Sequence, residues 1–199
     1  MVFIDQEGKT GHRWWLWVFL GQDTVVFRLD PTRSHDVPEK HFAQDACLIL
    51  MVDRYSAYKA MAQVKNGNIV LAYCWSHVRR DFVEVGKGWG ELKPWAIEWL
   101  RRIPLDNNAS EREHRNPAVG RKNYYGSGAL WSGNLAAMLF SIFATLHRWT
   151  LNPREWLTRY LQACAENGGK APADIARFLP WNLGAKNTTA ATVVPPDSS

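Results

Sequence analysis

Short apolar segments separated by turns fill the first half of the chain. Aromatic and β-branched residues occupy 14–20 (WWLWVFL) and 24–29 (TVVFRL), and the Gly-Gln-Asp between them predicts a β-hairpin. The segment 47–52 (CLILMV) is apolar without interruption and stops at Asp53. Such a pattern is typical of a strand that is buried on both faces.

Strand and helix patterns alternate around this segment. The N-terminal residues 1–5 (MVFID) form a short apolar stretch that ends in Asp5. Helical spacing is found at 55–64 and in the amphipathic stretch 75–85, and strand character returns between them at 68–74. This alternation predicts an α/β fold.

The second half is predicted to be helical. The segment 134–149 is apolar nearly all round, which predicts a buried helix. A second helix is predicted at 152–169, with Asn152 as N-cap, Pro153 in the first position and a pair of glycines as the stop. The small and polar residues at 184–199 predict a disordered tail.

Composition places the chain among folded proteins. It has 199 residues, 46% of them hydrophobic, which excludes global disorder. Lys and Arg number 24 against 19 Asp and Glu, a balance that favours a polyanionic partner. The 3 cysteines are scattered in apolar contexts, which indicates a reducing compartment without a disulfide framework. No segment reaches the roughly 18 apolar residues of a membrane span, so we expect a cytoplasmic protein without a membrane partner.

Two aspartates follow strand-like segments and suggest a metal site. If their strands are neighbours, Asp5 and Asp53 lie at one edge of the sheet, where open α/β sheets place their sites. Mg²⁺ prefers hard oxygen ligands and keeps positions open for water and phosphate oxygens. Glu111, about one turn inside a helix predicted after the Asn pair 107–108, is the candidate third ligand, and Glu113 and Asp106 compete with it.

Basic side chains surround these carboxylates in the sequence. The candidates for phosphate contacts form two groups. The first is His77, Arg79 and Arg80 in the stretch WSHVRR, and the second is Arg112, Arg115, Arg121 and Lys122. Arginine offers forked donors that suit phosphate. The alternatives are a solvated helix face for any single arginine and a partly buried, satisfied His77. Cys74 and His77 have a spacing found in zinc sites, but no second pair follows, so we interpret Cys74 as a core residue.

Six ordered motifs together resemble one protein family. They are ID at 4–5, VDRYSAY at 52–58, CWSHVRRDF at 74–82, LDNNASEREHR at 105–115, GRKNYYGSG at 120–128 and NPREWLTRYL at 152–161. This series is similar to the IS66 family of bacterial insertion-sequence transposases. The resemblance implies an RNase H-like mixed sheet with flanking helices and a DDE triad of Asp5, Asp53 and Glu111. It also implies two Mg²⁺ (or Mn²⁺) ions, transposon-end and target DNA as partners, a homo-oligomer on DNA and a place at the bacterial nucleoid.

The resemblance gives an expected domain organisation. The RNase H-like catalytic core spans 1–118, a helical C-terminal segment spans 119–183, and the tail spans 184–199. Members of the family carry a longer, mainly helical insertion where this chain has only 83–103, so we expect a shortened insertion there. The family's usual N-terminal helix-turn-helix and zinc-binding segments are not expected ahead of the first aspartate.

Three other functions remain open from the sequence. A tyrosine recombinase would use Arg and His residues with Tyr124 or Tyr125 as the nucleophile. A catalytically inactive transposase remnant would only bind DNA. A standalone RNase H-like nuclease would cut RNA–DNA hybrids without joining DNA ends.

Overall fold

The structure is a computed structural model that describes residues 2–6, 9–102, 112–113, 115, 117–119 and 128–184. The chain divides into two compact units. The first unit combines Met1–Trp17 with Leu29–Leu130, and the second combines Val18–Arg28 with Trp131–Ser199. The fold is mixed α/β, as the sequence pattern predicts.

The first three strands form one sheet in chain order. Strand β1 (Val2–Gln6) pairs antiparallel with β2 (Lys9–Leu20), and β3 (Val25–Asp30) lies on the other side of β2. The turn between β2 and β3 is closed by the Gly21 N–H, which donates to the Thr24 carbonyl at 2.8 Å. The predicted hairpin is therefore confirmed.

Strands β4 (Leu48–Val52) and β5 (Ile69–Tyr73) form a separate parallel pair. The expectation that 47–52 is buried on both faces is wrong. Ile49 is 74% exposed and Met51 51% exposed, and the partner of Ile49, Val70, is 57% exposed. No described element covers the face that carries these side chains, so half of the apolar surface of β4 meets solvent.

The strand pairing separates β1 from β4. Within the described residues, β1 is paired only with β2, and β4 only with β5. Asp5 lies inside β1, where the register shifts between Ile4 and Gln6, and not at the end of the strand. The prediction places Asp5 beside Asp53 only if their strands are neighbours, and β1 and β4 are not neighbours in this pairing.

The described residues of the first unit also form the helices α1 (Asp36–His41), α2 (Ala57–Ala60), α3 (Ala62–Lys65), α4 (Trp75–Gly88) and α5 (Lys93–Arg102), and the 3₁₀ turn η1 (Gly90–Leu92). The single helix predicted at 55–64 is divided between α2 and α3. Met61 separates the two, with a ψ of 139° that no α-helix allows and a side chain that is 0% exposed. The Ala62 N–H at the start of α3 donates to the Glu39 carboxylate at 3.0 Å, and burial of the Met61 side chain favours the break.

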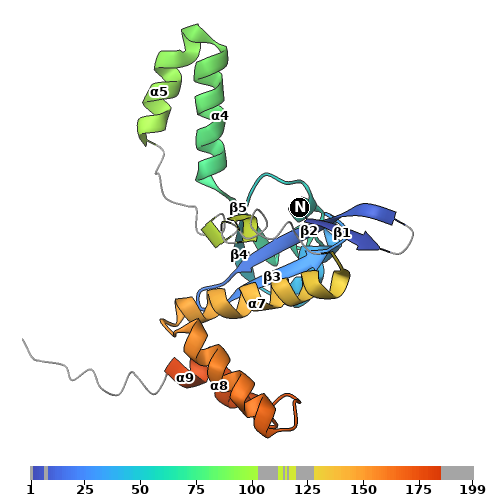
Figure 1. The fold of residues 1–199 in the computed structure, drawn as a ribbon. Coiled ribbons are helices and arrows are strands. Elements are labelled where there is room, and N and C mark those ends of the chain that lie inside the picture. The colour runs from blue at the N-terminus through green and yellow to red at the C-terminus, as the bar shows by residue number, and fades with distance from the viewer. Residues whose placement is uncertain are drawn as a thin grey trace, which may run out of the picture. The chain divides into compact units, whose positions relative to one another are not determined.

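Helices α4 and α5 lie side by side as a hairpin (Figure 1). Helix α5 and the end of α4 occupy the segment 83–103, where the shortened insertion is expected. The two helices approach closely where Gly86 meets Ala96, which is 1% exposed, and a Cβ on Gly86 would lie 3.4 Å from the Ala96 Cβ. The Phe82 ring packs against Trp95 and Trp99 at centroid distances of 5.1 and 5.8 Å.

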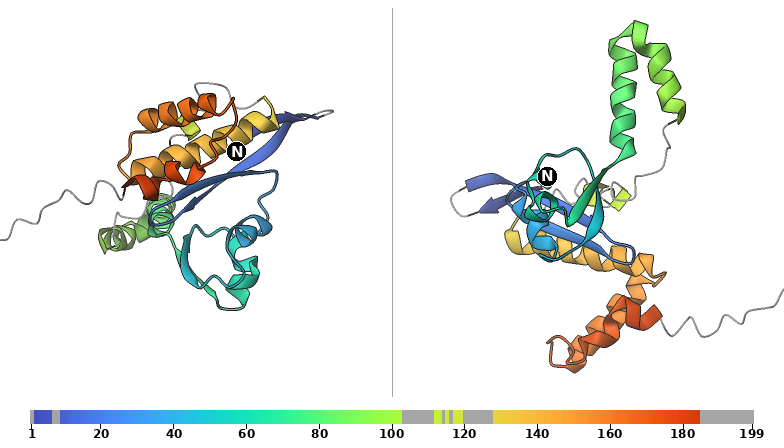
Figure 2. Two further views of the ribbon diagram at one scale, coloured as in Figure 1. Left: turned by 90° about the horizontal axis from the view of Figure 1, so that it is seen from below. Right: turned by 180° about the vertical axis from the view of Figure 1, so that it is seen from behind.

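In the second unit, helix α7 (Leu130–Arg148) runs along β3, as Figures 1 and 2 both show. The Thr145 hydroxyl accepts from the Val25 N–H at 3.1 Å and donates to the Val25 carbonyl at 3.2 Å. One turn earlier, the Ser141 hydroxyl accepts from the Phe27 N–H at 2.8 Å. Four helical residues and two strand residues span similar lengths, about 6 and 7 Å, so the two hydroxyls match alternate positions along β3.

The burial predicted for α7 is only partly correct. Ala137 and Leu146 are buried, but Trp131 is 71% exposed and Met138 53% exposed. By length and composition α7 could cross a membrane, although the sequence analysis finds no such segment. The core helices of soluble proteins have the same length and composition. One face of α7 lies against β3, where Thr145 and Ser141 contact the strand.

Helix α8 (Pro153–Glu166) begins and ends as predicted. The Asn152 side chain accepts from the backbone N–H groups of Arg154 and Glu155 at 3.0 and 3.4 Å. Gly168 and Gly169 have positive φ angles of 64° and 78°, and they end the helix with hydrogen bonds back to its last turn. The described chain ends with η2 (Ile175–Phe178) and α9 (Pro180–Gly184). The tail predicted at 184–199 lies almost entirely outside the described residues.

Candidate functional site

The carboxyl ends of β4 and β5 place Asp53 beside the start of α4. Asp53 directly follows β4, and Cys74 directly follows β5. The Cys74 N–H donates to the Val52 carbonyl at 2.9 Å, so the parallel pairing continues to the last residue before Asp53. Helix α4 then begins at Trp75. Open parallel sheets bind their ligands at this edge, beyond the carboxyl ends of the strands.

The Asp53 carboxylate is half-buried and only partly engaged. Its Oδ1 accepts the Tyr55 N–H at 3.0 Å, and Oδ2 has no hydrogen-bond partner in the described part of the chain. The adjacent cation, Arg54, pairs with Asp81 on α4 instead. Because that pairing engages the Arg54 charge, Arg54 leaves one oxygen of Asp53 without a partner among the described residues at the sheet edge.

Aromatic rings pack around this aspartate. Tyr58 meets Tyr55 and Trp17 edge to face, at centroid distances of 6.4 and 6.1 Å. Burial raises the pKa of the Tyr58 phenol to about 12; the charge of Asp53 adds to this rise, and the charge of Arg33 opposes it. The phenol therefore stays protonated at neutral pH, and both Asp53 and Arg33 lie close enough to act on it.

Arg33 is the functional candidate that the sequence analysis misses. Its guanidinium carbon lies 4.5 Å from the centroid of the Trp15 ring and 4.3 Å from that of the Tyr55 ring. The Tyr55 hydroxyl donates to the Arg33 carbonyl at 2.9 Å, and the Trp17 indole N–H donates to the carbonyl of the preceding Thr32 at 3.3 Å. Tyr55, two residues after Asp53, is recognisable in the sequence as an aromatic side chain. No local pattern predicts its contact with an arginine 22 residues earlier.

The other predicted metal ligands cannot be compared with Asp53 in this structure. Asp5 is placed only as a backbone position within β1. Glu111 and its competitor Asp106 lie outside the described residues, and Glu113 lies in a short helical stretch and is half-buried. Within the described residues, no group of three or more His, Cys, Asp or Glu side chains is placed to hold a metal ion. The triad thus stays a prediction.

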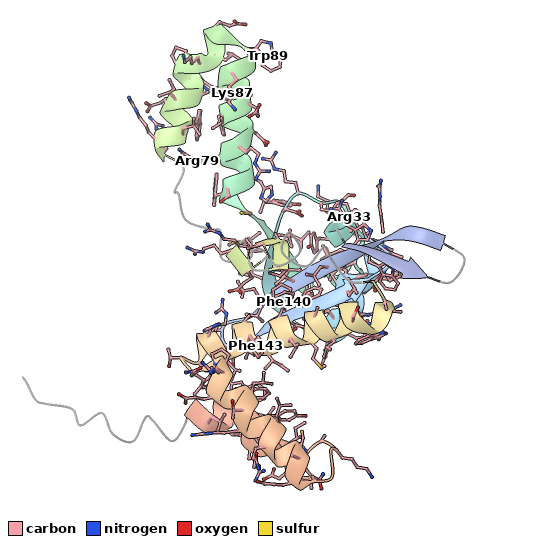
Figure 3. The ribbon with its side chains drawn as sticks, in the orientation of Figure 1. Arg33, Arg79, Lys87, Trp89, Phe140 and Phe143 are labelled. Carbon is pink, nitrogen blue, oxygen red and sulfur yellow. The ribbon has the colours of Figure 1, made fainter. Side chains whose placement is uncertain are left out.

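The basic residues predicted on α4 differ in their surroundings. The Arg79 guanidinium donates to the Leu100 carbonyl at 2.6 Å and so joins the first turns of α4 to the end of α5 (Figure 3). Arg80 is exposed, and His77 is half-buried with its N–H donating to the Cys74 carbonyl at 3.2 Å. Cys74 is buried, which agrees with its interpretation as a core residue. Contact of His77, Arg79 or Arg80 with DNA stays a prediction.

The second group of predicted phosphate contacts is only partly described. Arg112 and Arg115 are exposed on the short helical stretch that also carries Glu113. Arg121 and Lys122 lie outside the described residues, as do Tyr124 and Tyr125, which a tyrosine recombinase would require.

A carboxylate at the carboxyl edge of a parallel strand pair, in a mixed α/β fold, lies where open α/β sheets bind their ligands. The family comparison is more specific. The model of the Transposase IS66 family matches residues 1–101, and the chain belongs to this family. The matched range includes β1, Arg33 and its aromatic neighbours Trp15 and Tyr55, Asp53, α4, and α5 up to Arg101.

Two curated relatives come from Sinorhizobium fredii, and both are named as uncharacterized. The protein y4hP is 31% identical over 93 residues, which cover 47% of this chain and 16% of that protein. The protein y4qI is 35% identical over 93 residues, covering 40% of this chain and 17% of that protein. The matched part of the chain thus spans less than a fifth of the length of these relatives. No solved structure matches the chain significantly.

Proposed function

We propose that the chain is part of a DNA transposase that cleaves DNA strands at the ends of an insertion sequence and joins them to target DNA. Membership of the Transposase IS66 family supports the substrate, DNA, and the general reaction. The observation that carries the proposal for this chain is the position of Asp53, which follows β4 at the carboxyl edge of the parallel pair with one carboxylate oxygen available. The reaction belongs in the bacterial cytoplasm, at the nucleoid.

The finer assignment is an RNase H-like core in which Asp5, Asp53 and Glu111 hold two divalent cations. Asp53 fits this role because its Oδ1 needs only one N–H, while Oδ2 remains for a cation. Mg²⁺ or Mn²⁺ bound there would activate a water or a 3′-hydroxyl and stabilise the leaving oxygen. The protein's own part is to hold the carboxylate in place, through the Tyr55 N–H and the parallel pairing of β4 with β5.

The DNA-binding part of the proposal rests on positive charge. Arg80, Arg112 and Arg115 are exposed, as phosphate contacts require. The proposed set is completed by His77, Arg79, Arg121 and Lys122. Contacts of this kind position DNA without reading its sequence. Self-assembly of the chain on DNA is part of the same proposal.

The second candidate is a catalytically inactive transposase remnant that only binds DNA. The pairing scheme favours it in one respect, because β1, which carries Asp5, is not a direct neighbour of β4 in the described sheets. A remnant would keep salt-sensitive DNA binding and lose metal-dependent cleavage.

Nicking of supercoiled plasmid in Mg²⁺ separates these candidates. We expect nicking by the wild-type chain and a loss of about 100-fold or more in Asp53→Asn, because a displaced or missing ligand at a reacting centre has an effect of that order. Asn keeps an acceptor for the Tyr55 N–H, so the fold is retained. Asp45→Asn, an exposed loop carboxylate, is the matched control. Equal nicking by wild type and Asp53→Asn would refute the assignment, and DNA binding without nicking would select the remnant.

A further inference from the structure

The Arg33 guanidinium is held in place before any ligand arrives. The rings of Trp15 and Tyr55 flank it at 4.5 and 4.3 Å, and each ring gives a cation–π contact. A cation–π contact is an attraction to the ring quadrupole and forms no hydrogen bond, so these two contacts leave the N–H donors of Arg33 available. Arg33 is exposed, so these donors can reach a ligand from solvent (Figure 3).

Arg33 differs from two other arginines of the same unit, Arg54 and Arg102, in having no carboxylate partner among the described residues. Arg54 pairs with Asp81, and Arg102 pairs with Glu98 at 2.8 Å. Across the residues that the structure describes, Arg33 has aromatic contacts and no acidic partner. An arginine that is fixed in position with its charge unpaired is suited to an anion that comes from outside the protein.

Tyr55 links this arginine to the candidate metal ligand. Its backbone N–H donates to the Asp53 carboxylate at 3.0 Å, its ring stacks on the Arg33 guanidinium, and its hydroxyl donates to the Arg33 carbonyl at 2.9 Å. One residue therefore sets the positions of both Asp53 and Arg33. An anion bound by Arg33 would therefore lie near Asp53 through their shared contacts with Tyr55.

We propose that Arg33, clamped between Trp15 and Tyr55, binds a phosphate of the DNA backbone beside Asp53 and so positions the strand for reaction. This inference rests on the proposed DNA substrate. Arginine suits the role because its forked donors can bind two phosphate oxygens, while the aromatic clamp removes the entropic cost of ordering a long side chain. Arg33 is a positioning residue in this proposal, since it contacts the backbone of the substrate and supplies no proton or electron.

The salt dependence of DNA binding tests this role without any chemistry. The affinity of wild type for a fluorescent DNA duplex is measured by anisotropy at several KCl concentrations in EDTA. Each lost phosphate contact lowers the slope of log K against log salt by about 0.9. We expect this decrease in Arg33→Ala and in Arg33→Met, whose apolar stem keeps the two rings apart, and we expect Arg33→Lys to keep most of the slope.

The control is Arg159→Ala, an exposed arginine on α8 in the second unit. It should leave the slope unchanged, and thermal unfolding of each variant identifies any loss of fold. A wild-type slope in both Arg33→Ala and Arg33→Met would overturn the Arg33 proposal while the transposase proposal stands. Salt-independent or absent binding by wild type would overturn both proposals.

A last arm separates DNA phosphate from free phosphate. Isothermal titration of inorganic phosphate into wild type and into Arg33→Met measures binding of the free ion. Phosphate binding by wild type and not by Arg33→Met, with the same salt slope of DNA binding in both proteins, would reassign the clamp to a free phosphate ion and overturn the DNA contact.

Discussion

The Cys74 N–H and the Val52 carbonyl form a hydrogen bond of 2.9 Å beyond the last pair of β4 and β5. This hydrogen bond keeps β4 and β5 together up to the residues at which both strands end. Asp53 and the N-terminus of α4 therefore lie at the same edge. A carboxylate placed by two strands and the Asp53–Tyr55 turn has little freedom to move. A metal ligand requires such a fixed position.

Metal binding can be detected without catalysis through its effect on stability. A cation that binds only the folded chain stabilises it by about 2.7 kcal/mol when its concentration is 100 times Kd. We expect the unfolding temperature of wild type to rise with Mg²⁺ or Mn²⁺, and the rise to be much smaller in Asp53→Asn. Differential scanning fluorimetry measures both, with Asp45→Asn as the control. An equal rise in wild type and Asp53→Asn would exclude Asp53 as a ligand.

The close approach of Gly86 and Ala96 sets the spacing of the α4–α5 hairpin. Ala96 is 1% exposed, so Ala96→Leu must push the helices apart, at a cost of about 1–3 kcal/mol. We expect faster amide hydrogen exchange throughout α4 and α5 in this variant. Ile97→Leu, at a position 41% exposed, is the matched control and should exchange like wild type. Unchanged protection in Ala96→Leu would show that the hairpin accommodates the larger side chain without separating the two helices.

The Thr145 hydroxyl satisfies both backbone groups of Val25 on β3. Thr145→Val keeps the shape of the side chain and removes both hydrogen bonds, which leaves a buried N–H and a buried carbonyl unsatisfied. We expect the free energy of unfolding to fall by about 1–3 kcal/mol. Urea denaturation measures the change. Thr158→Val, at an exposed position on α8, should change stability by less than about 0.5 kcal/mol.

A smaller effect of Thr145→Val, equal to that of Thr158→Val, would show that water replaces the hydroxyl and that the contact between α7 and β3 is solvated. The same comparison therefore tests whether α7 covers the edge of β3, which otherwise presents unpaired backbone groups.

Local signals explain which parts of the structure could be predicted. The β2–β3 turn, the Asn152 cap and the Gly168–Gly169 stop depend on residues close in sequence, so pattern and turn chemistry identified them. The break at Met61 was missed because burial in the core overrides helical spacing. The position of Asp53 directly after β4 agrees with the prediction, because strand ends are local features.

Long-range contacts explain what the sequence could not provide. The Arg33 clamp joins three segments whose proximity no local pattern encodes. The exposure of β4 was missed for a related reason: an apolar run shows that a strand can be buried, but not which elements are present to cover it. The position of Asp5 relative to Asp53 depends on strand order, which alternating patterns alone do not determine.

The uncovered apolar surfaces of the first unit lead to the last prediction. On the β4–β5 pair, Ile49 and Val70 are adjacent in the parallel register and are 74% and 57% exposed. The α4–α5 hairpin adds Trp89, which is 57% exposed. Contiguous exposed apolar patches promote association and bind hydrophobic dyes. We therefore expect the purified chain to self-associate and to increase the fluorescence of such a dye.

Variants at these exposed positions separate surface exposure from loss of fold. Ile49→Thr with Val70→Thr keeps β-branched residues in both strands and removes apolar surface, so we expect less dye binding and less association at an unchanged unfolding midpoint. Trp89→Ser should act independently, because it lies on the hairpin and not on the sheet. Light scattering and dye fluorescence, measured on the same samples, give both readings. A monodisperse wild-type chain without dye binding would mean that these apolar faces are covered in solution, and the surface argument would fail.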